Sequence, residues 1–257
     1  MTRLEQLLRR DQLVVVGALL FVTLLAWAYI FSGAGMDMGD SAMDHMNMQM
    51  AWTPGYATIV FLMWWIMMVA MMLPSASPTI LLFAKINRQR REAGKAYVAA
   101  GTFALGYLLI WGFFSAVATA AQWALVSSGL LSIAMASTNQ TLSAAILIAA
   151  GLWQFTPLKR ACLRHCRSPF HFVVSGFRPG ELGALRMGVE HGVFCLGCCW
   201  FLMALLFYGG VMNLYWIAGL AMYVLIEKIA PVGEWIGRLA GAGLIVWGTV
   251  LLVNMRF

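Results

Sequence analysis

Five cysteines fall in two short groups that could together bind a soft metal ion: Cys162 and Cys166 in "CLRHC", and Cys195, Cys198 and Cys199 in "EHGVFCLGCCW". Thiolates at helical spacing suit Cu(I) in low-coordinate geometry, or Zn(II) in tetrahedral geometry. The alternative interpretation is packing, because free cysteines also behave as small hydrophobic side chains. A disulfide framework is not expected, because the number of cysteines is odd and both groups are predicted to lie on the reducing side of a membrane.

His191 stands four residues before Cys195, so a helix that contains both offers an imidazole and several sulfurs on one face. The neighbouring Glu190 either orients this imidazole through a hydrogen bond or lies at the membrane surface near the start of the helix. Cys195 and Cys198 also form a C-x-x-C pair, whose spacing is typical of thiol–disulfide exchange. A metal site and a thiol relay are both compatible with this segment.

The polar segment "MDMGDSAMDHMNMQM" at residues 36–50 carries a second set of soft donors, among them Met43, His45, Met46 and Met48. Thioether sulfur is an uncharged soft ligand that suits Cu(I) and binds hard cations poorly. The alternative is a disordered loop whose methionines face lipid or a partner protein. Because the segment has no apolar periodicity that packing would require, we interpret it as a metal-capturing tether.

Methionines continue directly after this segment, in "FLMWWIMMVAMMLPSASP". They recur every four residues in two rows: Met63, Met67 and Met71, and Met68 and Met72. On a helix each row lies on one side, about 6 Å between neighbours, so the thioethers could pass a copper ion inward. Methionine is also an ordinary filler of apolar helices, and core packing is the competing interpretation. Pro74 and Pro78 predict a bend in the same helix.

The elements that must position these donors are membrane helices. The chain is 62% hydrophobic and 11% charged over 257 residues, far more apolar than a soluble domain. Apolar runs near the length of about 20 residues that a membrane crossing needs occur near 13–32, 56–84, 97–126, 141–158, 189–208, 214–230 and 237–254. Because these runs are continuously apolar, the sequence predicts an all-α, polytopic transmembrane bundle of about seven helices, one integral membrane domain over 1–257.

The basic residues lie on alternate connections between these runs, and only Arg256 falls on the other side. The positive-inside rule therefore places the amino terminus in the cytoplasm of a multi-pass protein, expected in a bacterial cytoplasmic (inner) membrane. It makes 33–55 an extracytoplasmic Met-rich loop and 159–188 a cytoplasmic loop. Topology thus explains the net charge of +7, so we expect anionic membrane lipid and no nucleic acid as a partner. Glu227 and Lys228 are expected to form an interfacial ion pair.

Three stretches are more specific than any general transmembrane pattern: "WWIMMVAMMLPSASP", "AAGLWQFTPLKRACLRHCRSP", and "GVEHGVFCLGCCWFLMALLFYGGVMNLYW" followed by "EK" at 227–228. Together they resemble a bacterial family of predicted metal-binding integral membrane proteins, also described as copper chaperones, over about residues 60 to 230. That family is associated with copper supply to a tyrosinase, so the resemblance implies copper delivery. The segment 36–50 lies outside the shared stretches and supports copper independently.

We therefore expect a copper-handling membrane protein, a chaperone or transporter without enzymatic activity, that captures Cu(I) at the outer loop and passes it to thiolates near the cytoplasmic face. The sequence contains no GxxxxGK[ST] stretch, the phosphate-binding motif that would indicate ATP-driven transport. The expected partners are the copper ion and an apo copper oxidase or a metallochaperone. Two alternatives stay open: a transmembrane thiol relay through Cys195 and Cys198, and a structural subunit of a larger membrane complex. The sequence does not fix the direction of transfer or distinguish copper from another soft metal.

Overall fold

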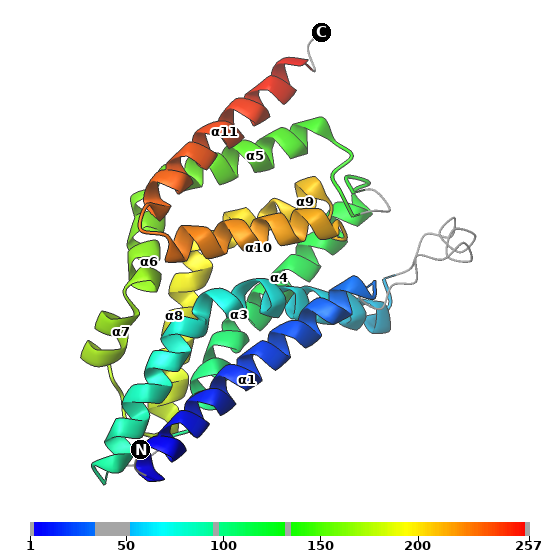
Figure 1. Cartoon of the computed structure of the whole chain (residues 1–257). Helices are drawn as coiled ribbons and strands as arrows, with labels where there is room; N and C mark the ends of the chain where they lie inside the picture. The colour runs from blue at the N-terminus through cyan, green and yellow to red at the C-terminus, as the bar shows by residue number, and fades with distance from the viewer. Residues whose placement is uncertain (1–2, 34–51, 95–97, 132–134, 255–257) are drawn as a thin grey trace.

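A computed structural model describes residues 3–33, 52–94, 98–131 and 135–254, and this part of the chain is a bundle of helices (Figure 1). Within it the only β-type pairing is an isolated bridge between Leu131 and Ser137. The predicted all-α fold is therefore confirmed. The segment 36–50, with its predicted ligands Met43, His45, Met46 and Met48, lies outside the described residues.

The long apolar helices match the predicted runs. The helices are α1 (Arg3–Phe31), α3 (Pro54–Glu92), α4 (Ala100–Ser127), α5 (Gln140–Phe155), α6 (Pro157–Arg167), α7 (Pro169–Ser175), α8 (Gly180–Ala204), α9 (Leu206–Gly209), α10 (Leu214–Ile229) and α11 (Gly233–Asn254). In the described part of the chain, 5 helices are long and apolar enough to cross a membrane, or up to 6 if α5 and α6, bent by 66°, form one span. The bundle is thus compatible with a membrane, while seven crossings and their orientation stay predictions.

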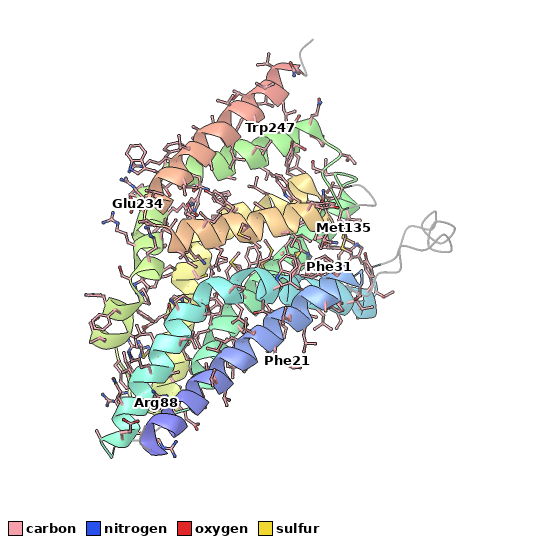
Figure 2. The ribbon with its side chains drawn as sticks, viewed as in Figure 1. Phe21, Phe31, Arg88, Met135, Glu234 and Trp247 are labelled. Atoms are coloured by element: carbon pink, nitrogen blue, oxygen red, sulfur yellow. The ribbon has the colours of Figure 1, made fainter. Side chains whose placement is uncertain are left out.

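The outer surface of the bundle is apolar, as a lipid environment requires. Phe21 on α1 is 63% exposed and Trp247 on α11 is 59% exposed, and both side chains lie on the outside of the molecule (Figure 2). α1 packs against α3, and α11 packs against α5, so these helices have one face on the bundle and another face free. Such faces suit contact with acyl chains and would be unfavourable in water.

The segment predicted as a loop at 159–188 is largely helical. α6 begins after Thr156, whose side chain accepts a hydrogen bond from the Lys159 backbone N–H, and Pro157 occupies its first turn, where a missing N–H costs nothing. α7 also has a proline, Pro169, in its first turn, but the side chain of Ser168 before it makes no capping hydrogen bond. α8 begins at Gly180, earlier than the apolar run indicates, because its first turns are polar. The cysteines of "CLRHC" therefore lie on a short helix rather than on an irregular connection.

α3 contains both Pro74 and Pro78 and is bent, as the sequence predicts (Figure 1). Pro78 has no N–H to donate to the carbonyl of Pro74, and the Ser77 hydroxyl supplies that hydrogen bond at 2.8 Å. The Met72 carbonyl accepts hydrogen bonds from Ser75 Oγ at 2.9 Å and from Tyr107 Oη of α4 at 3.1 Å. The hydrogen bond from Tyr107 joins α3 to α4 at the depth of the methionines.

Glycines allow α4 and α8 to approach closely. A Cβ added at Gly188 of α8 would lie 2.0 Å from the Phe103 carbonyl oxygen, and one added at Gly106 of α4 would lie 2.2 Å from the Leu185 carbonyl oxygen. Small residues on both sides of a crossing let helix backbones pack directly, as in other membrane bundles. This contact holds Tyr107, the residue after Gly106, against the helix that carries three cysteines.

The crossing predicts opposite effects for two glycines of α4. Gly106→Ala should lower the free energy of unfolding by about 2 kcal/mol or more, because the new methyl group meets backbone that has no room to move. The control, Gly101→Ala, meets nothing within 4 Å and should stabilise the helix by up to about 1 kcal/mol. Thermal or denaturant unfolding of the purified protein in detergent micelles measures both. Equal stability of the two variants would contradict the tight crossing.

Candidate metal centre

The three cysteines of α8 are completely buried in the bundle. The exposed fractions of Cys195, Cys198 and Cys199 are 1%, 0% and 0%. They lie within the C-terminal half of α8, whose early turns are fixed against α4 by the glycine crossing. Because all three residues are less than two turns apart on one helix, their thiols lie in one small region of the core.

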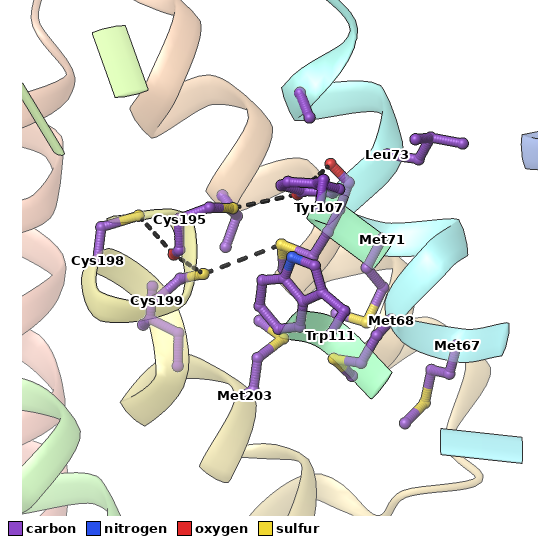
Figure 3. Packing of buried hydrophobic residues seen from close by; sticks show 14 of the residues in the cluster. Met67, Met68, Met71, Leu73, Tyr107, Trp111, Cys195, Cys198, Cys199 and Met203 are labelled. Carbon is purple, nitrogen blue, oxygen red and sulfur yellow. Dashed lines mark hydrogen bonds between the residues drawn. The ribbon is translucent and has the colours of Figure 1, made fainter. Parts of the chain in front are cut away.

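The thiols of this group make specific contacts. Cys198 Sγ and Cys199 Sγ each donate a hydrogen bond to the Cys195 carbonyl oxygen at 3.0 Å, and Cys199 Sγ lies 3.9 Å from Met72 Sδ on α3 (Figure 3). Thiol and thioether sulfurs from two different helices are thus in contact. Such a pairing offers a soft ion a charged ligand beside a neutral one.

The cysteines of α6 lie beside those of α8. The Cys166 thiol interacts with those of Cys195 and Cys198. Cys162 Sγ lies 2.8 Å from the position that a Cβ on Gly197 would occupy, so the missing side chain of Gly197 makes room for this thiol. The two groups of cysteines, which are separate in the sequence, therefore share one site, and all five are free thiols.

Three polar residues that sequence analysis did not select complete the surroundings of Cys195. Lys228 Nζ of α10 donates to Cys195 Sγ at 2.9 Å and to Ser75 Oγ of α3 at 3.0 Å. The Tyr107 hydroxyl lies 3.1 Å from the same sulfur (Figure 3). The signal for Lys228 was present in the sequence, because an ionisable residue in an apolar helix is a functional candidate by default.

The prediction that Glu227 and Lys228 form an interfacial ion pair is wrong. Glu227 is 1% exposed, and its Oε1 lies 2.5 Å from Lys159 Nζ of α6, which also donates to Gln154 Oε1 of α5. Successive residues on a helix point about 100° apart, so Glu227 reaches α6 while Lys228 reaches the cysteines. The ion pair between Glu227 and Lys159 ties the bent α5–α6 pair to α10.

His191 lies one turn before Cys195 and is 2% exposed. Its ring packs among those of Phe103, Tyr107 and Phe172, at centroid distances of 6.0, 5.7 and 5.6 Å. Its Nδ1 is buried and has no hydrogen-bond partner among the residues that the structure describes, which is uncommon for a polar atom in a folded core. The imidazole is therefore a candidate donor beside the thiols.

Glu190, which the sequence left with two possible roles, is paired with arginines. Its Oε1 lies 2.9 Å from Arg178 Nη1 and 3.5 Å from Arg186 Nε. These partners lie near the start of α8, where the side chains are partly exposed. The structure therefore favours the surface role for this carboxylate over the orientation of His191.

The two methionine rows of α3 face the interior. Met63, Met67, Met68, Met71 and Met72 are all 2% exposed or less. Figure 3 shows Met67, Met68 and Met71 on one side of Trp111 and the α8 cysteines on the other, with Met203 nearby.

Near the start of these methionine rows, the Trp64 indole N–H donates to Gln122 Oε1 at 2.7 Å, and Gln122 Nε2 donates to Met135 Sδ at 3.1 Å. Burial alone fits packing as well as metal transfer, so the predicted ladder stays a prediction.

The sulfurs are close but do not form a finished chelate. Among the described residues, no three His, Cys, Asp or Glu side chains are arranged to hold a metal ion directly. Cys198 and Cys199 point their thiols at the Cys195 carbonyl oxygen, so a rotation about χ1 must turn them toward a shared ion.

A family model described as PpoB2, copper chaperone, matches residues 61–251. No curated protein and no solved structure matches the chain. The matched region contains all five cysteines, the methionine rows of α3 and Lys228, while the segment 36–50 lies before it.

The buried ion pair next to this site predicts a strong and reversible effect on stability. Lys159→Met should lower the free energy of unfolding by about 3 kcal/mol, because the Glu227 carboxylate would stay buried without its partner. Lys159→Met combined with Glu227→Met should recover most of that loss. Arg186→Met is the control, because its ion pair is exposed and should contribute less than about 1 kcal/mol. A double variant less stable than Lys159→Met, measured by unfolding in detergent, would contradict this explanation.

Proposed function

The chain belongs to the PpoB2 copper chaperone family, and we propose that it holds Cu(I) at the buried thiols of α6 and α8 for delivery to a copper enzyme. The observation that carries this proposal is the contact of Cys199 Sγ with Met72 Sδ, at 3.9 Å. It joins the end of a buried methionine series to the start of a cluster of free thiols. Cu(I) accepts both kinds of sulfur as ligands.

The order of the ligands gives transfer a direction. The Met-rich segment 36–50 offers neutral thioethers and an imidazole, α3 offers thioethers alone, and α8 offers thiols that can become thiolates. A monovalent cation binds more strongly to a charged thiolate than to a neutral thioether. The free energy of the copper ion would therefore fall at each step, from capture at an outer loop, through passage along α3, to retention at Cys195, Cys198 and Cys199. Such transfer needs no ATP-driven pump.

Release to a receiving protein is best placed at the end of α6. A hollow of about 380 Å3 lies there, with Arg164, His165, Ser168, His171 and Phe172 among its lining residues. His165 is the residue before Cys166, which interacts with the α8 thiols. An apo copper oxidase or a metallochaperone that offers its own sulfur or imidazole ligands could take the ion from this side. If the amino terminus is cytoplasmic in a bacterial inner membrane, this hollow faces the cytoplasm.

The alternatives are less well supported. A thiol–disulfide relay needs one sulfur that a partner disulfide can approach in line, and Cys195 and Cys198 are both buried. A purely structural subunit would have no use for free thiols beside an unpartnered His191 Nδ1. Both alternatives predict a purified protein that retains no copper.

The first test removes the thiols. In a protein with Cys195→Ser, Cys198→Ser and Cys199→Ser, Cu(I) retention should fall by about a hundredfold, because a hydroxyl is a hard and weak ligand for this ion. Metal analysis after desalting, together with competition against a chromophoric Cu(I) chelator, measures this loss. Circular dichroism and gel filtration verify that the variant is folded. Undiminished retention would remove α8 from the mechanism.

The second test separates the function of the methionines from their packing. Met68→Leu with Met72→Leu keeps the core volume nearly unchanged, so the fold should persist while Cu(I) loading of the thiols slows several-fold. Deleting 36–50 should lower loading at limiting copper and leave saturated binding unchanged. Stopped-flow mixing with Cu(I) delivered by a weak chelator measures the rates.

The control is Met222→Leu, which removes a thioether from a side chain that is 57% exposed on α10. It should load at the wild-type rate. If the double variant of α3 also loaded at that rate, its methionines would serve packing alone.

A further inference from the structure

Lys228 presents a buried positive charge to the sulfur at the centre of the site. Its side chain comes from α10, is 7% exposed as a residue, and places Nζ 2.9 Å from Cys195 Sγ. We propose that Lys228 is the fixed counter-charge that makes the thiol site prefer a monovalent over a divalent metal ion. This inference rests on the proposed function, because it concerns which ion the same thiols accept.

No carboxylate neutralises this ammonium in the described part of the chain. Its contacts there are Cys195 Sγ and Ser75 Oγ, and the ionisable groups near it are Tyr107, His191 and the three thiols of α8. The adjacent Glu227 is engaged by Lys159 at 2.5 Å. The positive charge of Lys228 is therefore available to balance negative charge on sulfur.

Charge balance then decides between ions, because a net charge in an apolar interior is costly. Before metal binding, a Cys195 thiolate and the Lys228 ammonium sum to zero. When Cu(I) binds, it forms one bond to the Cys195 thiolate and one to a second sulfur such as Cys199, whose thiol proton leaves to solvent. No electron is transferred. The dithiolate complex carries one negative charge, and the ammonium again brings the site to zero.

A divalent ion does not reach this balance with two thiolates. With Zn(II) or Cd(II) the same two sulfurs and the ammonium sum to one positive charge, so a third thiol must also lose its proton. Monovalent Cu(I) and Ag(I) meet the condition with fewer ligands. The preference thus comes from the charge that the protein supplies, in addition to the softness of sulfur.

The position of Lys228 also leaves the route from the methionines open. The ammonium contacts Cys195, whereas Met72 of α3 contacts Cys199. Figure 3 shows the Cys195 thiol directed toward Tyr107 and the Cys199 thiol directed toward a methionine sulfur of α3. An ion that arrives along α3 therefore meets Cys199 before it comes close to the positive charge.

A purely structural role for Lys228 predicts something different. The ammonium donates to Ser75 beside the prolines of α3, so it could serve only to join α10 to the bend of that helix. Gln can keep hydrogen bonds to Ser75 and Cys195 but carries no charge. Arg keeps the charge with a different shape. These two substitutions distinguish a charge from a hydrogen-bond donor.

The experiment loads purified protein in detergent with equal Ag(I) and Cd(II), ions that keep their oxidation state, and measures the bound ratio by mass spectrometry. Wild type should retain mainly Ag(I). Lys228→Gln and Lys228→Met should shift the ratio toward Cd(II) by about tenfold or more, the size expected for a partly screened charge at close range. Lys228→Arg should keep the wild-type preference. Arg186→Gln is the control, because it removes a positive charge whose ion pair with Glu190 is partly exposed and does not involve the thiols.

An unchanged ratio in Lys228→Gln would overturn the inference and leave the proposed function intact. If the neutral variants do not fold, Lys228→Arg decides: a wild-type ratio supports a role for the charge, and a shift toward Cd(II) overturns it. A wild-type protein that retains neither ion would instead refute the proposed function, and the inference with it.

Discussion

The cost of a charge in an apolar interior is the constraint on which the centre of this protein depends. Two lysine ammonium groups are buried deep in the bundle, and each contacts a polar group on another helix. Lys159 meets the Glu227 carboxylate at 2.5 Å, and Lys228 meets the Cys195 thiol at 2.9 Å. Because an unpaired buried charge is strongly destabilising, these contacts fix α10 against α6 and α8. They also leave one positive charge facing sulfur instead of a carboxylate.

The thiol site also requires that α8 be held in a fixed position, and close backbone packing against α4 provides this. The glycine contacts between α4 and α8 bring Tyr107 to within 3.1 Å of Cys195 Sγ, and the glycine at 197 leaves space for Cys162. Neither contact needs a polar side chain. Helices in lipid gain little from apolar association, and direct contact of this kind then supplies the specificity of helix packing.

Methionine has two uses in this bundle that do not exclude each other. Its flexible side chain fills the space between α3 and α8, and its sulfur remains a ligand after it has been packed. A packed row of thioethers can therefore lie within the core at no loss of stability. The contact of Met72 with Cys199 is the point at which these thioethers meet thiols.

The sequence alone determined the elements and the chemistry of the donors. The continuous apolar runs predicted a helical membrane bundle, because every backbone group in lipid must be bonded within its own segment. The spacing of the cysteines indicated that Cys195 and Cys199 share a helix face, and the motifs indicated the copper chaperone family. These features are local, so periodicity and residue type reveal them.

Tertiary structure alone decided which donors meet and which charges pair. Nothing in the spacing of residues shows that Cys166 joins Cys195, or that neighbouring Glu227 and Lys228 have different partners on different helices. Those contacts depend on the bend after α5, the glycine crossing of α4 and α8, and the rotation of α10. A partner far along the chain is chosen by how helices pack, and that choice depends on the whole bundle and not on any one segment.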